Sequence, residues 1–174
     1  MTDRFTFRDV VVALLENAVD EARAGHCRVI DVELSADAVR VSDDGRGLPL
    51  GPHPQSGRPL SEVILTGPRR GPRNTLARVN AACLWLELRV CRDGALWAQR
   101  FEFARPEKPL ERRGAATGSG TTITAAPAQG EAPSFEELRE CVRALSSSGL
   151  GRAVRVRLRD RRASRDETIV IGRR

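Results

Sequence analysis

Two polar side chains near the start of the chain have the type and spacing to hold a ligand. In the stretch LLENAVDEARAGHC (14–27), Asn17 and Asp20 lie one helical turn apart, beside the apolar stripe of the expected helix. Asparagine is a poor helix-interior residue, because its amide competes with the backbone for hydrogen bonds. A satisfied surface amide would explain Asn17 equally well, so position alone leaves both roles open.

A second candidate group is the carboxylate that ends the stretch VRVSD (39–43). Strict alternation puts Asp43 on the apolar face of this strand, and a buried carboxylate needs hydrogen-bond donors to offset its desolvation. The next four residues are DGRG (44–47). Gly45 and Gly47 permit a sharp turn and a close backbone approach to a ligand, although many hairpin turns have the same pattern.

The elements that must position these groups mix helices and strands. Apolar residues at helical spacing predict a first helix, and alternating residues predict strands on a sheet rich in antiparallel pairs. Helices are predicted at 7–24 with Gly25 as its C-terminal cap, at 61–66, at 74–82, and from the capping box at 134–137 to Leu145. Strands are predicted at 28–34, 38–43, 84–91, 95–103, 121–125, 153–159 and 168–171, with loops at 45–59 and 67–73 and a polar linker at 104–120.

Composition excludes several classes. The chain of 174 residues is 40% hydrophobic, which fits one domain, and no run of eighteen apolar residues or leader is found, so we expect a cytoplasmic protein. The four cysteines and two histidines form no C-x-x-C pair or ligand cluster, so neither zinc nor disulfides are indicated. A net charge of +6 permits DNA contacts through arginines, but dispersed aromatics argue against a stacking platform.

The order of these motifs resembles the GHKL (Bergerat-fold) ATPases, which include gyrase, histidine kinases and a heat-shock chaperone. The sequence is most similar to the ATPase region of the bacterial gyrase B subunit and its topoisomerase IV counterpart. The resemblance implies a two-layer α/β sandwich, one nucleotide-binding domain over 1–174, and no transducer or topoisomerase core domain. The stretches that carry it are ENAVDEARAGHC (16–27), VSDDGRGLPLGPHP (41–54), SEVILTG (61–67), SGTTI (119–123) and SSGLGRAVRVRLRDRR (147–162).

The resemblance also implies which residues hold the nucleotide. Asn17 would bind, through its amide oxygen, the Mg²⁺ that bridges the phosphates, and Asp43 would accept the adenine amino proton. Thr121 would hydrogen-bond through its hydroxyl near that carboxylate. Arg92 would pair with Glu21 at the pocket mouth, where aminocoumarin inhibitors bind. The implied set is Asn17, Asp20, Glu21, Asp43, Gly45, Gly47, Pro49, Arg92 and Thr121.

One departure from the family pattern concerns catalysis. Gyrase-like enzymes carry the general base, a glutamate, one turn before the magnesium asparagine, and Ala13 occupies that position here. General-base catalysis contributes roughly 10²- to 10⁴-fold, so we expect little turnover. Glu16 lies about 100° around the helix from Asn17 and is no substitute. We therefore assign no catalytic residue.

A second departure concerns the phosphates. Gyrase-like domains cradle the triphosphate with backbone amides of a glycine-rich lid. Here only 17 residues separate Glu62 from Asn80, without a G-x-x-G-x-G motif or a lysine, so the cradle is expected to be missing. Arg69, Arg70 and Arg73 could touch phosphates from this short loop, although a solvated basic loop is favoured.

Three functions remain open. The first is binding of ATP or ADP by a pseudoenzyme that is at most a very slow ATPase and not a topoisomerase by itself. The second is a resistance or decoy protein that binds gyrase inhibitors of the aminocoumarin type. The third is an interaction module for a topoisomerase or DNA, in which Asn17 and Asp43 are relics of the fold. Because only six residues precede Phe7, in place of a dimerising arm, we expect a monomer.

Overall fold

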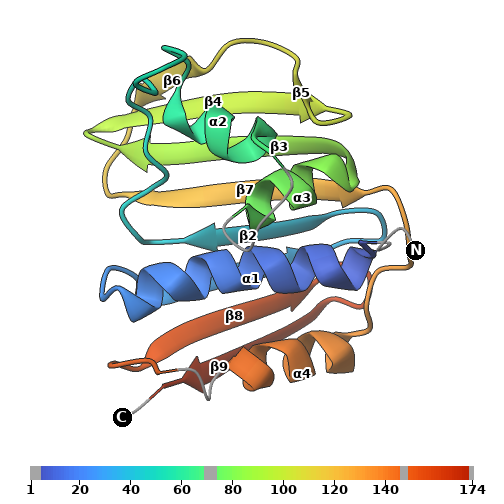
Figure 1. The fold of residues 1–174 in the computed structure, drawn as a ribbon. Coiled ribbons are helices and arrows are strands. Elements are labelled where there is room, and N and C mark those ends of the chain that lie inside the picture. The colour runs from blue at the N-terminus through green and yellow to red at the C-terminus, as the bar shows by residue number, and fades with distance from the viewer. Residues whose placement is uncertain (1–4, 69–73, 146–148, 173–174) are drawn as a thin grey trace.

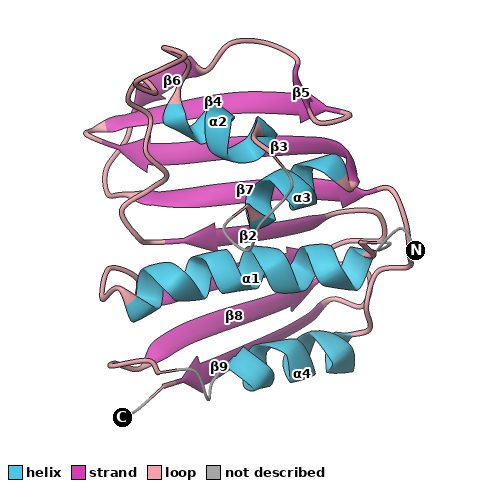
Figure 2. Cartoon of the chain, in the orientation of Figure 1, coloured by secondary structure: helices cyan, strands magenta, loops and turns pink. Residues whose placement is uncertain are grey.

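The helices and the sheet form two layers. The structure, a computed structural model, describes residues 5–68, 74–145 and 149–172. In these ranges four helices lie on one face of the sheet, and the opposite face carries no helix (Figure 1, Figure 2). This arrangement confirms the predicted two-layer α/β class. The helices are α1 (Phe7–Arg23), α2 (Leu60–Thr66), α3 (Thr75–Ala81) and α4 (Phe135–Leu145).

The sheet is mixed and mostly antiparallel, as predicted. Its nine described strands follow the order β5-β4-β3-β7-β2-β1-β8-β9, and β6 also pairs with β4. The parallel pair joins β1 to β8, with Ile30 beside Val156. The strands are β1 (Val29–Leu34), β2 (Val39–Asp43), β3 (Cys83–Arg92), β4 (Ala95–Glu102), β5 (Arg105–Pro106), β6 (Glu111–Ala115), β7 (Gly120–Pro127), β8 (Val154–Asp160) and β9 (Arg165–Ile171).

Helix α1 has both ends fixed by local sequence. Thr6 and Asp9 form a capping box at its start. At its end Gly25 has a φ of 85°, and the N–H groups of Gly25 and His26 bond back to Ala22 and Glu21 carbonyls. The face toward the sheet is buried: Phe7, Val10, Val11, Ala13, Leu14, Leu15, Ala18, Val19 and Ala22. Packing of this stripe fixes how α1 is rotated on the sheet. The positions next to the stripe therefore lie at the edge of the buried face.

The predicted linker at 104–120 is wrong, because it contains β5 and β6, which both pair with β4. Their short polar sequences show no apolar alternation. The turn between β4 and β5 consists of Phe103 and Ala104, whose φ values are 48° and 64°, and such turns normally favour Asn-Gly. The sequence therefore carries no turn signal there. Strand β9 also begins earlier than predicted, since Asp166 and Arg165 already pair with β8.

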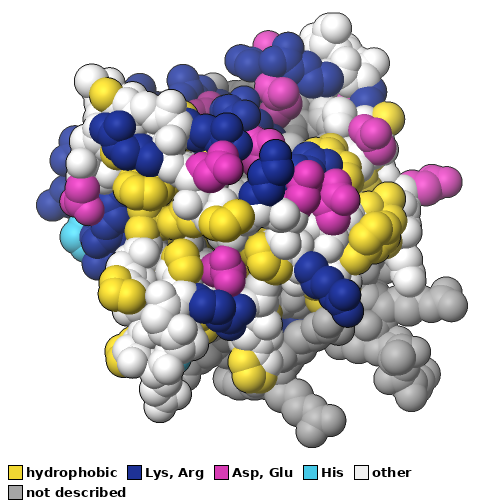
Figure 3. Space-filling model, turned by 90° about the horizontal axis from the view of Figure 1, so that it is seen from above, with side chains coloured by type: hydrophobic (Ala, Val, Ile, Leu, Met, Phe, Trp, Pro, Cys, Tyr) yellow, Lys and Arg dark blue, Asp and Glu magenta, His cyan; other side chains and the backbone are white. Residues whose placement is uncertain are grey.

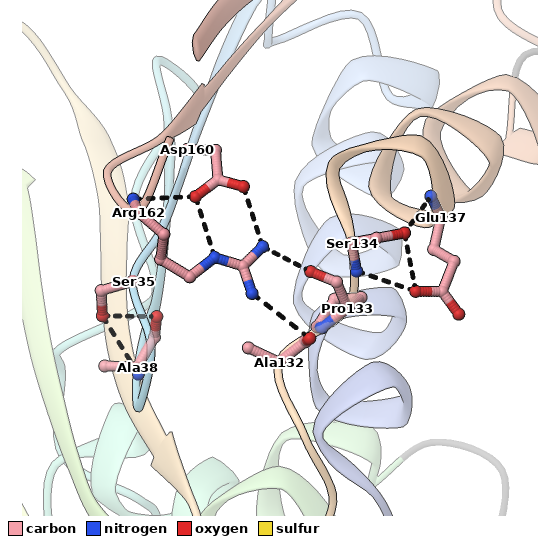
Figure 4. A network of polar contacts seen from close by, with 8 residues as sticks. All are labelled: Ser35, Ala38, Ala132, Pro133, Ser134, Glu137, Asp160 and Arg162. Carbon is pink, nitrogen blue, oxygen red and sulfur yellow. Dashed lines mark hydrogen bonds and ion pairs between the residues drawn. The ribbon is translucent and has the colours of Figure 1, made fainter. Parts of the chain in front are cut away.

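A polar network ties the C-terminal hairpin to the loop before α4 (Figure 4). The Arg162 guanidinium donates to the Asp160 carboxylate at 2.9 and 2.8 Å, and to the carbonyls of Ala132 and Pro133 at 3.3 and 2.7 Å. Asp160 is 3% exposed, and the hydrogen bond from Arg162 lowers the pKa of its carboxyl group. The capping box predicted for α4 is present beside this network.

The β4 side of the sheet is protected by charge. Strand β6 exposes Arg112 and Arg113, and Arg113 pairs with Glu111 at 3.0 Å. Charged edge strands discourage pairing with other chains. Figure 3 views the molecule from this side, where basic and acidic side chains are interspersed and hydrophobic ones lie in small groups. The net positive charge is thus not gathered into one basic patch on this face.

Candidate functional site

Asp43 ends β2 with its carboxylate on the helix side of the sheet, as the alternation predicted. It is 9% exposed, and its Oδ1 accepts the N–H groups of Gly45 at 2.9 Å and Thr121 at 3.3 Å. Its Oδ2 accepts no hydrogen bond from a described residue. Burial raises the pKa of Asp43 to about 6, although the two backbone hydrogen bonds oppose the shift.

Three glycines let the backbone close around Asp43. A Cβ atom at Gly120 would lie 2.0 Å from the Asp43 carbonyl oxygen, and one at Gly45 would lie 2.8 Å from Asp43 Oδ1. At Gly47 a Cβ atom would lie 2.9 Å from the Cys91 carbonyl oxygen. At Gly120 and Gly47 a larger residue would press on backbone atoms, whereas at Gly45 it would displace the side chains of Asp43 and Glu21. Gly120 was not among the predicted site residues. Its position directly before a predicted strand was the sequence feature that could have indicated its role.

Thr121 and Arg92 hold the loop that follows β2. The backbone N–H of Thr121 bonds Asp43, whereas its hydroxyl Oγ1, predicted to act near that carboxylate, accepts the N–H of Leu48 at 3.0 Å. Arg92 Nη1 donates to the carbonyl of Gly47 at 2.9 Å. Both side chains therefore fix the loop backbone beside Asp43.

The expected ion pair between Arg92 and Glu21 is wrong. Glu21 pairs with Arg46 instead, at 2.9 Å from Nη2 and 3.2 Å from Nε, and also accepts the Arg46 backbone N–H at 3.1 Å. The turn at Gly45 brings Arg46 against α1, while the ion pair of Arg92 is with Asp93 at 3.6 Å. The hydrogen bond from Arg46 lowers the pKa of Glu21.

Two cavities meet at Asn17. The first, of about 320 Å³, is lined by Asn17, Asp20, Glu21, Arg46, Gly47, Leu48, Pro49, Arg92 and Thr121. The second, of about 490 Å³, is lined by Ala13, Glu16, Asn17, Asp20, Leu48, Ile64, Thr75 and Leu76. Asn17 is half-buried, and its side chain makes no hydrogen bond to a described residue. Its amide is therefore free to serve a ligand, whereas the exposed Asp20 pairs with Arg23.

The second cavity has no titratable group at the position one turn before Asn17. Ala13 is 4% exposed and contributes only a methyl group. Glu16 lines the same cavity from an exposed position. The arginines predicted to reach phosphates, Arg69, Arg70 and Arg73, lie outside the described residues.

Sequence reasoning missed a role for Asp44. Its Oδ1 accepts the N–H groups of Arg28 at 2.7 Å and Val29 at 2.9 Å, which fixes the start of β1 beside the end of β2. The doubled aspartate in VSDDG was the available signal, because two adjacent carboxylates at a strand end face opposite ways. Asp43 faces the site and Asp44 anchors the neighbouring strand.

Comparison with known families decides the class. The family model described as histidine kinase-, DNA gyrase B-, and HSP90-like ATPase matches residues 2–131. The chain belongs to this family. Its two cavities and the buried Asp43 thus form the candidate nucleotide site of an ATPase-family domain. In the described residues, no helix has the length and apolar character to cross a membrane.

Relatives within this ATPase family include the DNA gyrase B subunits of several organisms. The Haloferax volcanii protein is 34% identical, covering 97% of this chain and 30% of its own length. The Thermotoga maritima protein is 37% identical over 68% of this chain and 21% of its own length. A novobiocin-resistant DNA gyrase B protein of Streptomyces niveus is 38% identical over 66% of this chain and 19% of its own length. The chain thus spans less than a third of the length of these relatives.

Proposed function

We propose that this domain binds adenine nucleotides and hydrolyses ATP very slowly or not at all. The observation that carries the proposal is the Asp43 carboxylate, which is buried and fixed through Oδ1, while its Oδ2 accepts no hydrogen bond from a described residue. An acceptor of this kind, beside the backbone of Gly47 and Thr121, suits the exocyclic amino group of adenine. Membership of the ATPase family supports nucleotide binding as the general activity.

Asn17 would hold the Mg²⁺ that accompanies a bound nucleotide. Its amide is half-buried, has no partner among the described residues and lies on the lining of both cavities. An amide oxygen is a suitable ligand for this hard cation, which keeps several waters and takes its other ligands from phosphates. The metal would neutralise phosphate charge, while the side chain of Asn17 would set its position.

The proposed slow hydrolysis rests on Ala13. A methyl group cannot take a proton from an attacking water, and loss of a general base removes roughly 10²- to 10⁴-fold of rate. Glu16 lies on a different face of α1 and is exposed to solvent. Substitution Ala13→Glu is therefore expected to raise ATP hydrolysis measurably above that of the wild type, whereas Ala13→Gln, of similar size, is not.

Calorimetric titration with ATP and ADP in magnesium buffer tests the binding. We expect similar affinities for the two nucleotides, and loss of binding in Asp43→Asn. If ATP bound at least tenfold more tightly than ADP, the γ-phosphate would have a dedicated site and the proposal would be wrong in that respect. If neither nucleotide bound to folded protein, the proposed nucleotide binding would be refuted.

A second candidate function is capture of gyrase inhibitors. The first cavity is built from Arg46, Pro49 and Arg92 around Thr121 and does not depend on the phosphate half of the site. One relative is the novobiocin-resistant DNA gyrase B protein. Novobiocin is therefore the third ligand of the titration. Micromolar or tighter binding of novobiocin together with negligible nucleotide binding would favour this function over the first.

A further inference from the structure

The second cavity has an apolar part. Four of its lining side chains are hydrocarbon, Ala13 from α1, Leu48 from the loop after β2, Ile64 from α2 and Leu76 from α3. Ala13 and Leu76 are 4% and 5% exposed, so they are firmly seated in the packing between the helices. The cavity volume of about 490 Å³ is in the range that holds a substantial part of a small ligand.

The charges that described residues place on this cavity are unfavourable for an anion. Within ranges 5–68, 74–145 and 149–172, its charged lining residues are Glu16 and Asp20, and both are carboxylates. Asp20 has a partner in Arg23, but Glu16 forms no ion pair with a described residue. A phosphate chain would bring like charge to these side chains, and an uncharged group would not.

The two cavities are connected through shared walls. Asn17, Asp20 and Leu48 line both of them. A ligand whose ring lies beside Asp43 reaches the second cavity by passing Asn17, the side chain that would otherwise meet the first phosphates. For adenosine, the atom that leads in this direction is the 5′ carbon of the ribose.

We propose that the second cavity takes an uncharged, apolar group carried at the 5′ position of adenosine. The preferred ligands of the site are then neutral 5′-substituted adenosines, and nucleoside polyphosphates are weaker ligands of the same pocket. This inference rests on the proposed binding of adenine. Ala13 then contributes to ligand binding, because its methyl group extends the apolar wall where a glutamate would place a charge.

A series of 5′-deoxy-5′-alkylthioadenosines tests the inference. The full chain is titrated calorimetrically with adenosine, ADP, ATP and the methylthio, propylthio and butylthio compounds. We expect affinity to increase about threefold to fourfold for each methylene that enters the cavity, so that the butylthio compound binds more tightly than ADP. ATP with magnesium should gain nothing over ADP.

Two variants test whether the alkyl group binds in the second cavity, and a third variant is the matched control. Ile64→Ser removes apolar wall from α2, and Ala13→Glu puts a charge into the cavity. Both substitutions should therefore reduce the increase in affinity with alkyl chain length. Val170→Ser makes a similar loss of hydrocarbon on the exposed face of β9, where Val170 is 49% exposed, and should leave the series unchanged. Melting temperatures verify that all variants are folded.

Three outcomes would overturn the inference. Affinity that is independent of chain length, or that falls with it, would show that the alkyl group does not enter an apolar cavity. Affinity that rises with the number of phosphates would show a phosphate subsite there. In both cases adenine binding stands. If no adenine compound bound at all, the proposed nucleotide binding would fail together with this inference.

Discussion

The two halves of the site are built in different ways. Around Asp43 the site is made of strand ends and turns, and hydrogen bonds or close glycine contacts fix nearly every backbone position. Around Ala13 it is made of Leu48 from a loop and side chains from three helices, two of which have only seven residues. The first half constrains residue identity through the backbone. The second can change its chemistry by exchanging side chains while the fold is kept.

The largest effect is expected at Gly120, in the first half. An alanine there would place Cβ 2.0 Å from the Asp43 carbonyl oxygen and 3.0 Å from its carbon, both backbone atoms. β7 would have to separate from β2, so the Gly120→Ala variant should lose more than about 3 kcal/mol of unfolding free energy. Urea denaturation measures the loss.

Gly118→Ala is the matched control for this prediction. Gly118 also has a positive φ, 85°, but a Cβ atom there would meet nothing within 4 Å. Only the backbone conformation is penalised, at about 1 kcal/mol. Equal losses in the two variants would mean that the contact with Asp43 is not what requires glycine.

The next effect concerns Asp43 and pH. Because burial raises its pKa to about 6, the folded state binds a proton more readily than the unfolded chain, and unfolding free energy falls as pH rises from about 4 to 6. A shift of about two pKa units corresponds to at most about 3 kcal/mol. Asp43→Asn should therefore be more stable than the wild type at pH 7.5 by about 1 to 2 kcal/mol, while losing adenine binding.

Denaturation curves between pH 4.5 and 7.5 measure how the unfolding free energies of the wild type and Asp43→Asn depend on pH. The stability difference between Asp43→Asn and the wild type should shrink as pH is lowered through 6. Asp44→Asn is the neighbouring control: Asp44 accepts the backbone N–H groups of Arg28 and Val29, so this substitution should not make the protein more stable. A less stable Asp43→Asn at pH 7.5 would contradict the prediction.

A smaller difference is expected in hydrogen exchange. Helices α2 and α3 have no side-chain hydrogen bond at their N-terminal caps, Pro59 and Asn74. Their amides should exchange at least about tenfold faster than those of β2 and β7. Helix α1, with 17 residues and a capping box, is the internal control and should exchange slowly. Uniform protection over all three helices would remove the distinction between the halves.

The smallest effect is expected at the mouth of the first cavity. The side chains of Arg46 and Glu21 are 56% and 24% exposed, so Arg46→Ala should cost less than about 1 kcal/mol and less still at high salt. The pKa of Glu21 should rise toward its ordinary value, which an NMR titration measures. Arg157→Ala, which breaks an exposed pair with Asp31 in β1, should leave Glu21 unchanged.

The sequence predicted the elements in which local pattern and burial agree. The alternation of VRVSD identified the inward-facing Asp43, and the apolar stripe of α1 identified the half-buried Asn17. Both are consequences of regular periodicity against one core. The capping box of α4 has a short-range cause, so the local sequence was sufficient to predict it.

The remainder depended on contacts between distant residues. Nothing local shows that Glu21 meets Arg46 rather than Arg92, because the choice follows from how the turn at Gly45 folds back on α1. The turn at Phe103 and Ala104 is imposed by pairing of β4 with β5 against the preference of its own residues. Periodicity carries no information about such contacts.

The parallel pairing of β1 with β8 has a consequence for the time the protein needs to fold. β1 pairs with β2, the next strand in the chain, and with residues of β8 that follow 126 positions later, such as Arg157 opposite Asp31. Sheets dominated by such distant pairs fold in milliseconds to seconds. During synthesis at about 5 to 20 residues per second, β8 therefore follows β1 by about 6 to 25 seconds, and the edge of β1 that pairs with β8 stays unpaired for that time.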